Sequence, residues 1–424
     1  MKKGLAALFV VLLLACLSVS VFAEEIIINY PTFQIGVNTS APVVAKIVEG
    51  FNEKYAGQYK VVVEEVPGDS NYFEKMQVMI SSGSLPPVVY GAGKNLLDLA
   101  LAKDLVIDLT DIMGADEEWM AGFSDKAWTA NARNGRIYAA PSEGGKVGYF
   151  YNKELFAQAG IEKPAETWDE WFEIADKLKA AGITPFAMDT GDGAWCTQLM
   201  MGAMIATYSD EGLEFMNTYY PYNYDIEPVI KAAEMIVRMF DEYTTLDAVG
   251  GLYENAANNF FNGKVAMIAN GPWMIGDFSD TSKAPEGFDQ KVGTAIYPEG
   301  FVYEYQGEGM FATKQGDPAL EEAAIEFVRY FTSAESQLMA LETQGLLPAS
   351  PVVQVSDAAK EKFPILAEFL EKAAGATKSS NNFTGNMFSN MEDIVSQQMP
   401  LLATHVITPE EFAHALTEGA ELNK

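Results

Sequence analysis

The sequence predicts an α/β fold divided between two units, and three observations point to it. The chain has 424 residues, which is more than one hydrophobic core usually serves. Its 49% hydrophobic and 21% charged residues are typical of a globular protein that can bury a large core. From Glu25 onward, apolar runs of strand length alternate with segments of helical periodicity, as expected of a sheet flanked by helices.

The N-terminal segment alternates strands with helices. Glu25–Tyr30 is an apolar run typical of a buried strand, and apolar residues recur at helical spacing within Thr39–Tyr55, where Pro42 fits the first turn. The same patterns predict a strand, a helix and a strand at 60–66, 71–82 and 87–90. This order is typical of a parallel sheet, which binds ligands in the crevice outside the carboxyl ends of its strands.

A passage between the two units is expected after Pro141. Gly144 and Gly145 follow this proline closely and allow backbone geometry that other residues resist. Beyond them, Thr167 and Glu170 form a capping box that opens a helix ending near Gly182. Later helices are predicted at 199–206, 211–217, 227–243, 255–262, 318–331 and 334–343, and strands at 147–152, 265–269 and 292–296. We find no internal repeat, so we expect the units to be interleaved in sequence.

Composition excludes several functions. The chain carries 28 basic and 59 acidic residues, and its net charge of −31 would repel nucleic acid. Only His405 and His414 supply imidazole, and only Cys16 and Cys196 supply thiol, so a zinc site or a histidine-dependent nucleophile has few residues to draw on. We therefore expect no metal, no cofactor and no nucleic-acid partner.

The first 23 residues read as a secretory signal peptide. Lys2 and Lys3 precede an apolar run, and Ala23 offers a small residue at the cleavage site. We expect export to the periplasm or the cell exterior. An alternative reading takes Cys16 as the acylated cysteine of a lipoprotein. No later segment offers 18 unbroken apolar residues, so we expect no further membrane span.

An ordered set of short segments resembles the extracellular solute-binding proteins of ABC sugar importers, the maltose-binding-protein-like family 1. The resemblance spans nearly the whole mature chain, and its segments are Tyr149–Phe156, Thr167–Glu170, Ala180–Phe186, Phe261–Met267, Asn270–Trp273, Phe327–Ser333 and Gly345–Pro348. The ordered set points to the family and says little about the particular solute.

The resemblance implies a two-lobed periplasmic-binding-protein fold of type II, in which strands cross between hinged lobes. Crossings are expected near 139–143, 293–297 and 331–334. The first lobe would comprise 24–140 plus 295–332, and the second 141–294 plus 333–424. A monomer of this kind would close on a mono- or oligosaccharide and deliver it to the permease subunits of an ABC importer.

A sugar offers a face of C–H groups and a rim of hydroxyls, so its site needs aromatic surfaces and polar groups. Trp273 follows an apolar strand on a rigid turn, where the resemblance places a sugar-stacking tryptophan. Trp195 lies in a loop of small and polar residues, where a large indole needs an apolar partner. Asp192, in the same loop, can accept hydrogen bonds from hydroxyls or serve as a plain turn aspartate.

Other candidates come from loops expected to line the cleft. Lys94 follows the third strand and suits a hydroxyl or an acidic sugar, although it is equally explained as a surface lysine. Maltodextrin binders carry a tryptophan and an aspartate where this chain has Gly91 and Lys94, which puts maltodextrin itself in doubt. Glu143 is a candidate beside the crossing, with a hinge role as the alternative. Weaker candidates are Asn38, Glu308, Asn386 and Phe388.

The remaining tryptophans are expected in the core, since Trp168 and Trp171 share a helix with apolar residues at helical spacing and Trp119 and Trp128 show no sign of a site. Cys196 is expected to be a small buried hydrophobe. A hydrolase with paired carboxylates is the less favoured alternative, because no motif singles out an acid and a nucleophile. A binder of a non-sugar solute such as a polyamine also stays open.

Overall fold

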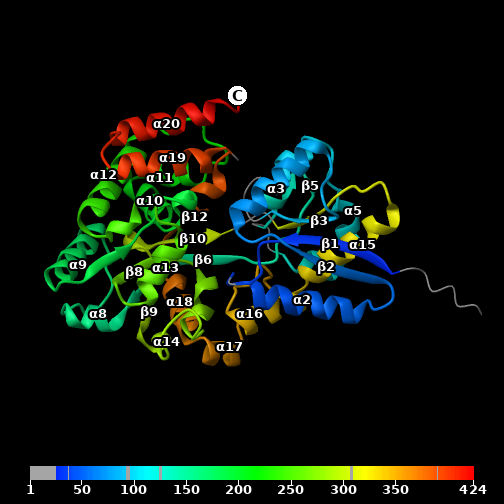
Figure 1. The fold of residues 1–424 in the computed structure, drawn as a ribbon, viewed down its shortest axis with the longest axis horizontal. Coiled ribbons are helices and arrows are strands. Elements are labelled where there is room, and N and C mark those ends of the chain that lie inside the picture. The colour runs from blue at the N-terminus through cyan, green and yellow to red at the C-terminus, as the bar shows by residue number, and fades with distance from the viewer. Residues whose placement is uncertain (1–24, 37, 92–95, 124–126, 306–308, 389) are drawn as a thin grey trace, which may run out of the picture.

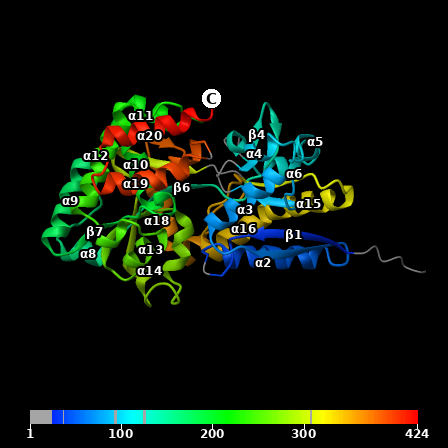
Figure 2. The same ribbon diagram turned by 45° about the horizontal axis from the view of Figure 1, so that its top comes forward.

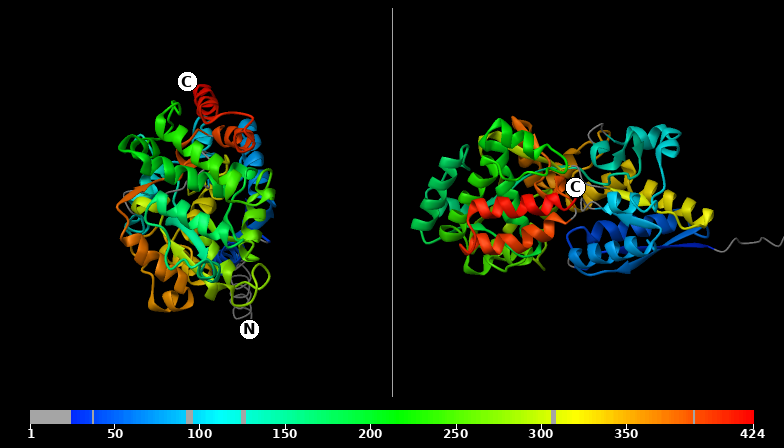
Figure 3. Two further views of the ribbon diagram at one scale, coloured as in Figure 1. Left: turned by 90° about the vertical axis from the view of Figure 1, so that its left-hand side faces the viewer. Right: turned by 90° about the horizontal axis from the view of Figure 1, so that it is seen from above.

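The computed structural model describes residues 25–36, 38–91, 96–123, 127–305, 309–388 and 390–424. Figure 1 shows two bodies side by side, joined near the middle of the molecule by strand β6 (Gly145–Asn152) and its neighbours. Seen from above, the bodies extend in opposite directions from this junction (Figure 3). The predicted leader and Cys16 lie outside the described residues.

The N-terminal body contains the strand–helix alternation expected from the sequence. Strands β1 (Ile26–Thr32) and β2 (Tyr59–Glu65) pair in parallel, whereas β3 (Val88–Tyr90) pairs antiparallel with β11 (Met310–Ala312). Its other elements are α2 (Ala41–Lys54), α3 (Asp69–Ser82), α4 (Leu96–Leu101), α5 (Thr110–Gly114), α6 (Glu117–Ala121), α7 (Trp128–Asn131), β4 (Ala132–Arg133), β5 (Arg136–Ile137) and α15 (Pro318–Phe331).

The C-terminal body is built on a mixed sheet with the strand order β12-β10-β6-β8-β7, and β9 also pairs with β6. Its strands besides β6 are β7 (Thr184–Ala187), β8 (Val265–Asn270), β9 (Val292–Ala295), β10 (Phe301–Tyr305) and β12 (Lys378–Ser380). Its helices are α8 (Lys153–Gln158), α9 (Trp168–Ala180), α10 (Trp195–Tyr208), α11 (Asp210–Met216), α12 (Glu227–Glu242), α13 (Tyr253–Phe261), α14 (Phe288–Lys291), α17 (Asp357–Lys362), α18 (Pro364–Ala374), α19 (Met391–Ala403) and α20 (Pro409–Glu421). Short 3-10 turns include η2 (Asp192–Ala194) and η4 (Pro272–Phe278).

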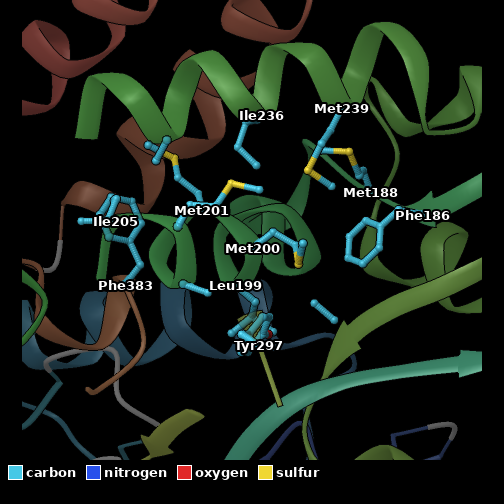
Figure 4. Packing of buried hydrophobic residues seen from close by; sticks show 14 of the residues in the cluster. Phe186, Met188, Leu199, Met200, Met201, Ile205, Ile236, Met239, Tyr297 and Phe383 are labelled. Atoms are coloured by element: carbon cyan, nitrogen blue, oxygen red, sulfur yellow. The ribbon is translucent and has the colours of Figure 1, made fainter. Parts of the chain in front are cut away.

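Helix α10 lies at the centre of the C-terminal body. Its residues 196–207 are all buried, so this helix is apolar on every side rather than along one stripe. Figure 4 shows Met200 and Met201 of α10 packed under Ile236 and Met239 of α12. Flexible thioethers fill irregular gaps between such helices, which explains the abundance of methionine in this core.

Helix α16 (Ala334–Gln344) packs between the two bodies. It lies against α2 of the N-terminal body and against η4 of the C-terminal body. Ala340 belongs to the core that contains β1, whereas the adjacent Leu341 belongs to the core around η4. The Gln344 side chain donates to Asp277 Oδ1 at 3.3 Å and completes the link to η4.

The structure confirms most of the predicted helices and strands. It adds helices that were not predicted, such as α4, α8, α17, α18 and α19, and it differs in three further respects. In the predicted capping box, the Thr167 hydroxyl accepts the N–H of Glu170 as expected. The Glu170 carboxylate accepts the backbone N–H of Glu166 instead of that of Thr167, so the box is only half formed. The parallel order predicted for the first three strands holds for β1 and β2, whereas β3 pairs antiparallel with β11 in a separate sheet. In the larger sheet, β6 runs antiparallel to β8, β9 and β10. Strand β10 has no counterpart in the sequence-based assignment, although its first three residues are buried.

Strand β10 bears on where the chain passes between the bodies. A crossing was expected near 293–297, but β9 and β10 both pair with β6, so the chain stays in the larger sheet until Tyr305 and reaches β11 at Met310. The segment 301–305 lies within the predicted first lobe yet pairs with the C-terminal body. The division into lobes otherwise stays a prediction. Across the described ranges, no helix combines the length and hydropathy needed to cross a membrane.

Candidate functional site

The segment Asn270-Gly271-Pro272-Trp273 forms the turn that ends strand β8. Every residue of β8 is buried, and the strand stops at Asn270 because Pro272 lacks the N–H that a further ladder bond would need. Pro272 instead begins the 3-10 turn η4, where its fixed φ is suitable. The turn therefore places Trp273 just beyond the carboxyl end of a central strand, as the sequence predicted.

Gly271 allows the Trp273 ring to fold back onto the backbone. A Cβ atom at Gly271 would collide with the six-membered ring of the indole. Trp273 is half-buried and packs against the core of the N-terminal body as well as two cores of the C-terminal body. Its indole is thus held at the junction of the bodies, with part of its surface exposed.

Trp195 is the first residue of helix α10 and is positioned by an unusual turn. Gly193 and Ala194 have φ values of 75° and 55°, so the chain turns through the left-handed region just before the helix. Asp189, which is fully buried, then accepts hydrogen bonds from the N–H groups of Cys196 and Thr197 at 3.0 and 3.3 Å. This side chain satisfies amides that the first helical turn leaves without partners.

The structure brings Trp195 and Trp273 together. Their ring centroids are 6.1 Å apart and their planes are inclined by 50°. Both indole N–H groups donate to Oδ1 of Asn270, at 2.7 Å from Trp273 and 3.3 Å from Trp195. Because both polar edges point toward the same buried amide, the two rings lie side by side with their planes inclined to each other.

Asn270 belongs to the candidate site, because both indoles bond to it, although it was not among the residues singled out from the sequence. Its side chain is buried, Oδ1 also accepts the N–H of Gly271 at 2.9 Å, and Nδ2 donates to the Tyr253 hydroxyl at 2.8 Å. A buried polar group costs stability unless it is hydrogen-bonded, and this amide is bonded on both sides. An asparagine at the end of an otherwise apolar strand was the available signal.

Glu143 lies beside the passage between the bodies and contacts the N-terminal body. The Tyr90 hydroxyl, at the carboxyl end of β3, donates to Glu143 Oε1 at 2.9 Å. Burial raises the pKa of Glu143 above its ordinary value, and the Tyr90 hydrogen bond partly opposes this shift. The carboxyl is therefore held at the carboxyl end of β3, beside the passage between the bodies.

Four further candidates either form only local hydrogen bonds or have side chains that the structure does not describe. Asn38 Oδ1 accepts the N–H of Ser40 at 3.0 Å, which is a turn bond at the start of α2. Lys94 and Glu308 lie outside the described residues. Asp192, in the C-terminal body, belongs to η2 by its backbone, and its side chain is not described. A ligand role for these four residues stays a prediction.

Asn386 and Phe388 differ in what they can offer a ligand. Asn386 is 4% exposed, and its amide donates to Met216 O at 2.7 Å and accepts from Asn381 at 3.0 Å, so it ties its segment to the end of α11. Phe388 is half-buried and stacks on Tyr220 with centroids 4.9 Å apart and planes inclined by 21°. Phe388 is the better candidate of the two, and its contact with a ligand stays a prediction.

Of the four tryptophans expected in the core, Trp119 and Trp171 are buried, whereas Trp168 and Trp128 are half-buried and pack at its edge. Trp168 packs against the core of the C-terminal body while donating to Thr207. Cys196 is fully buried, and burial raises the pKa of its thiol well above the ordinary value, so it is the inert hydrophobe that was expected. Among the residues that the structure describes, no group of three acidic, histidine or cysteine side chains gathers in a metal-binding arrangement.

The arrangement suits a ligand with an apolar face and a polar rim. The inclined indoles of Trp195 and Trp273 provide flat apolar surface. Glu143 and Tyr90, at the passage between the bodies, provide groups that can form hydrogen bonds.

Solved structures share the fold. A chitin-oligosaccharide-binding protein superposes with a TM-score of 0.82 over 94% of this chain and 99% of its own, at 20% identity. A maltose-bound protein of T. maritima gives 0.74 over 95% and 100%, also at 20% identity. The fold is that of the two-lobed solute-binding proteins.

Sequence comparison defines the family. The model of the family described as bacterial extracellular solute-binding protein matches residues 46–365, and the chain belongs to this family. A putative binding protein of Brucella abortus is 24% identical over 300 residues, which are 70% of this chain and 69% of that protein. The multiple sugar-binding protein of Streptococcus mutans is 25% identical over 227 residues, about half of each chain (50% and 51%). The xylose/arabinose-binding protein of Haloferax volcanii is 27% identical over 216 residues, 49% of this chain and 44% of that one.

Proposed function

We propose that the protein captures a carbohydrate, a mono- or oligosaccharide, between its two bodies and delivers it to an ABC importer. The observation that carries this proposal is the inclined pair of Trp195 and Trp273, locked through Asn270 at the junction of the bodies. Flat indole faces bind the C–H face of a sugar ring, and hydroxyls of the ring need polar partners such as Glu143 and Tyr90. The sugar-binding names of several relatives support the same class of ligand.

Binding would work by a shift between open and closed arrangements. Lobe 1 would comprise 24–140 plus 295–332, except for β10, which pairs with the second sheet, and lobe 2 would comprise 141–294 plus 333–424. A ligand that touches groups of both lobes favours the closed form by the difference between its affinities for the two forms. Asn38, Lys94 and Glu308 would contribute from lobe 1, and Asp192, Asn386 and Phe388 from lobe 2.

Delivery implies an exported protein that meets a membrane permease. We propose that the leader is cleaved after Ala23, with acylation at Cys16 as the alternative that would tether the protein to the membrane. The working unit is a monomer, and its task requires affinity without stabilisation of a transition state. We accordingly expect no turnover of the ligand.

Calorimetric titration of the purified mature protein tests the proposal. The panel contains monosaccharides, oligosaccharides of increasing length, a uronic acid and a polyamine, and chromatography of the recovered ligand follows each titration. Saturable heat with one carbohydrate, which is recovered unchanged, supports the proposal. Heat with the polyamine alone would replace the carbohydrate with another solute, and a shortened oligosaccharide would show a hydrolase.

A further inference from the structure

A hydrogen bond far from the tryptophan pair connects the two bodies directly. The Tyr220 hydroxyl donates to Oδ2 of Asp98. Tyr220 lies in the loop between α11 and α12 of the C-terminal body, whereas Asp98 lies on α4 of the N-terminal body. On α4, Leu97 and Ala100 are anchored in the core that contains β3, so Asp98 moves with that body.

Asp98 is held in place by Arg133. Nε and Nη2 of the guanidinium donate to the two carboxylate oxygens at 2.7 and 3.0 Å. This bidentate geometry fixes the orientation of the carboxylate as well as its charge. Arg133 belongs to β4, within the N-terminal body, so the acceptor is oriented by that body before Tyr220 reaches it.

Tyr220 is held just as firmly by the C-terminal body. Its φ of 54° lies in the left-handed region that a residue with a Cβ rarely adopts, so its surroundings must hold it there. The backbone N–H donates to the carbonyl of buried Asn386 at 2.7 Å, and the ring stacks on Phe388. Phe388 in turn packs against the main core of the C-terminal body.

This contact lies on the opposite side of the connecting strand from helix α16. In Figure 2, α4 and α11 lie on one side of β6, and α16 lies on the other. Contacts on both sides of β6 thus join the bodies, one through α16 and one through Tyr220. A hinge motion that separates α4 from α11 must break the hydrogen bond between Tyr220 and Asp98.

We infer that Tyr220 and Asp98 form a latch that favours the closed arrangement and thereby sets the affinity and residence time of the ligand. Tyr220 acts as a positioning residue, because it joins the bodies whether or not it touches the ligand. The effect on affinity rests on the proposed function, whereas the effect on the arrangement of the bodies does not. Apparent affinity scales with the populated fraction of the binding-competent form, so losing the latch lowers affinity.

Tyr220→Phe removes the hydroxyl and keeps the ring that stacks on Phe388. We expect an affinity about three- to tenfold lower, which is the range for one hydrogen bond of ordinary net strength, mainly through faster dissociation. Tyr222→Phe is the matched control, because Tyr222 also contacts Phe388 but its hydroxyl donates to Asn423 O at 3.4 Å. Equal dissociation rates for Tyr220→Phe and Tyr222→Phe would overturn the inference.

A ligand-free measurement separates the latch from the proposed function. Spin labels at Val78→Cys on α3 and Val406→Cys after α19, which are 68% and 65% exposed, report the distance between the bodies. Cys196 is fully buried and does not compete for the label. Without ligand, we expect Tyr220→Phe to shift the distribution of label-to-label distances away from the short distances of the closed arrangement. Tyr222→Phe should leave the distribution unchanged. Superimposable distributions for Tyr220→Phe and the labelled parent would reject the latch even if no sugar binds.

A double-mutant cycle assigns the effect to Asp98. In the Asp98→Ala background the Tyr220→Phe substitution should change neither the distance distribution nor the dissociation rate, because the acceptor is already gone. A Tyr220→Phe effect of undiminished size in that background would show that the hydroxyl acts through another group, and it would overturn the latch as described.

Discussion

The indole rings of Trp195 and Trp273 share a single acceptor, Oδ1 of Asn270, although one ring begins helix α10 and the other follows strand β8. The shared acceptor fixes the positions of both polar edges, and the inclination of 50° follows from the approach of two different backbones. Aromatic pairs tolerate several geometries at similar energy, so the amide rather than the ring contact selects this one. The site is therefore organised around a buried side chain that need not touch the ligand.

Replacing either tryptophan of the pair with alanine should weaken carbohydrate binding. We expect about a tenfold loss or more for each, since losing a large aromatic contact costs on the order of 1.4 kcal/mol or more at a binding site. Calorimetric titration measures the affinities. Trp128→Ala is the control, because Trp128 is also half-buried but packs against Phe123 in the N-terminal body. An equal loss in the control would point to general destabilisation.

Removing the shared acceptor should disorient both rings. Asn270→Leu keeps the approximate volume but leaves two indole N–H groups and the Gly271 N–H without this partner, each at a cost of about 1–3 kcal/mol if it stays buried. Asn270→Asp retains the accepting oxygen and should preserve the near-ultraviolet circular dichroism of the coupled indoles. We expect Asn270→Leu to lose that signal and ligand affinity together. Identical spectra for the two variants would contradict an orienting role.

Gly271→Ala should displace the Trp273 ring while leaving the core largely intact. The added methyl would occupy the space that the indole now fills, so the ring must move. We expect weaker carbohydrate binding and a shift in tryptophan fluorescence, with a smaller change in thermal stability than a core substitution causes. Gly263→Ala is not a suitable comparison because its φ of 64° is strained for alanine, so Gly114→Ala, which has open space around it, serves as control.

Glu143 should make stability depend on pH. Burial raises its pKa in the folded protein above the ordinary value of 4.5, so the folded state retains a proton that the unfolded state has released. The stability associated with this proton is fully present below the unfolded pKa and is lost as the pH rises through the folded pKa. We expect the melting temperature of the wild type to fall relative to that of Glu143→Gln as the pH rises from the unfolded pKa through the folded pKa. A constant difference between the two proteins at all pH values would argue against the shift.

The sequence predicted elements whose signals are local. Apolar residues at helical spacing gave α2, α12 and α15, and Gly83 marked the end of α3 because its φ of 69° suits a glycine. Thr408 and Glu411 form a reciprocal capping box at the start of α20, which is a local signal of the same kind. Strand β10 was missed because its place in the sheet depends on pairing with β6 and β12, which are distant in sequence.

The sequence by itself therefore determined the α/β class, the family resemblance and the choice of Trp195 and Trp273 as candidate site residues. Periodicity, turn chemistry and composition are local properties of the chain. Only the tertiary structure decided that these rings share Asn270, that Asn386 donates to Met216 at the end of α11, and that Tyr220 reaches Asp98. Each of these contacts joins residues from separate elements. Their distances are set by how the sheets and helices pack, which no local pattern encodes.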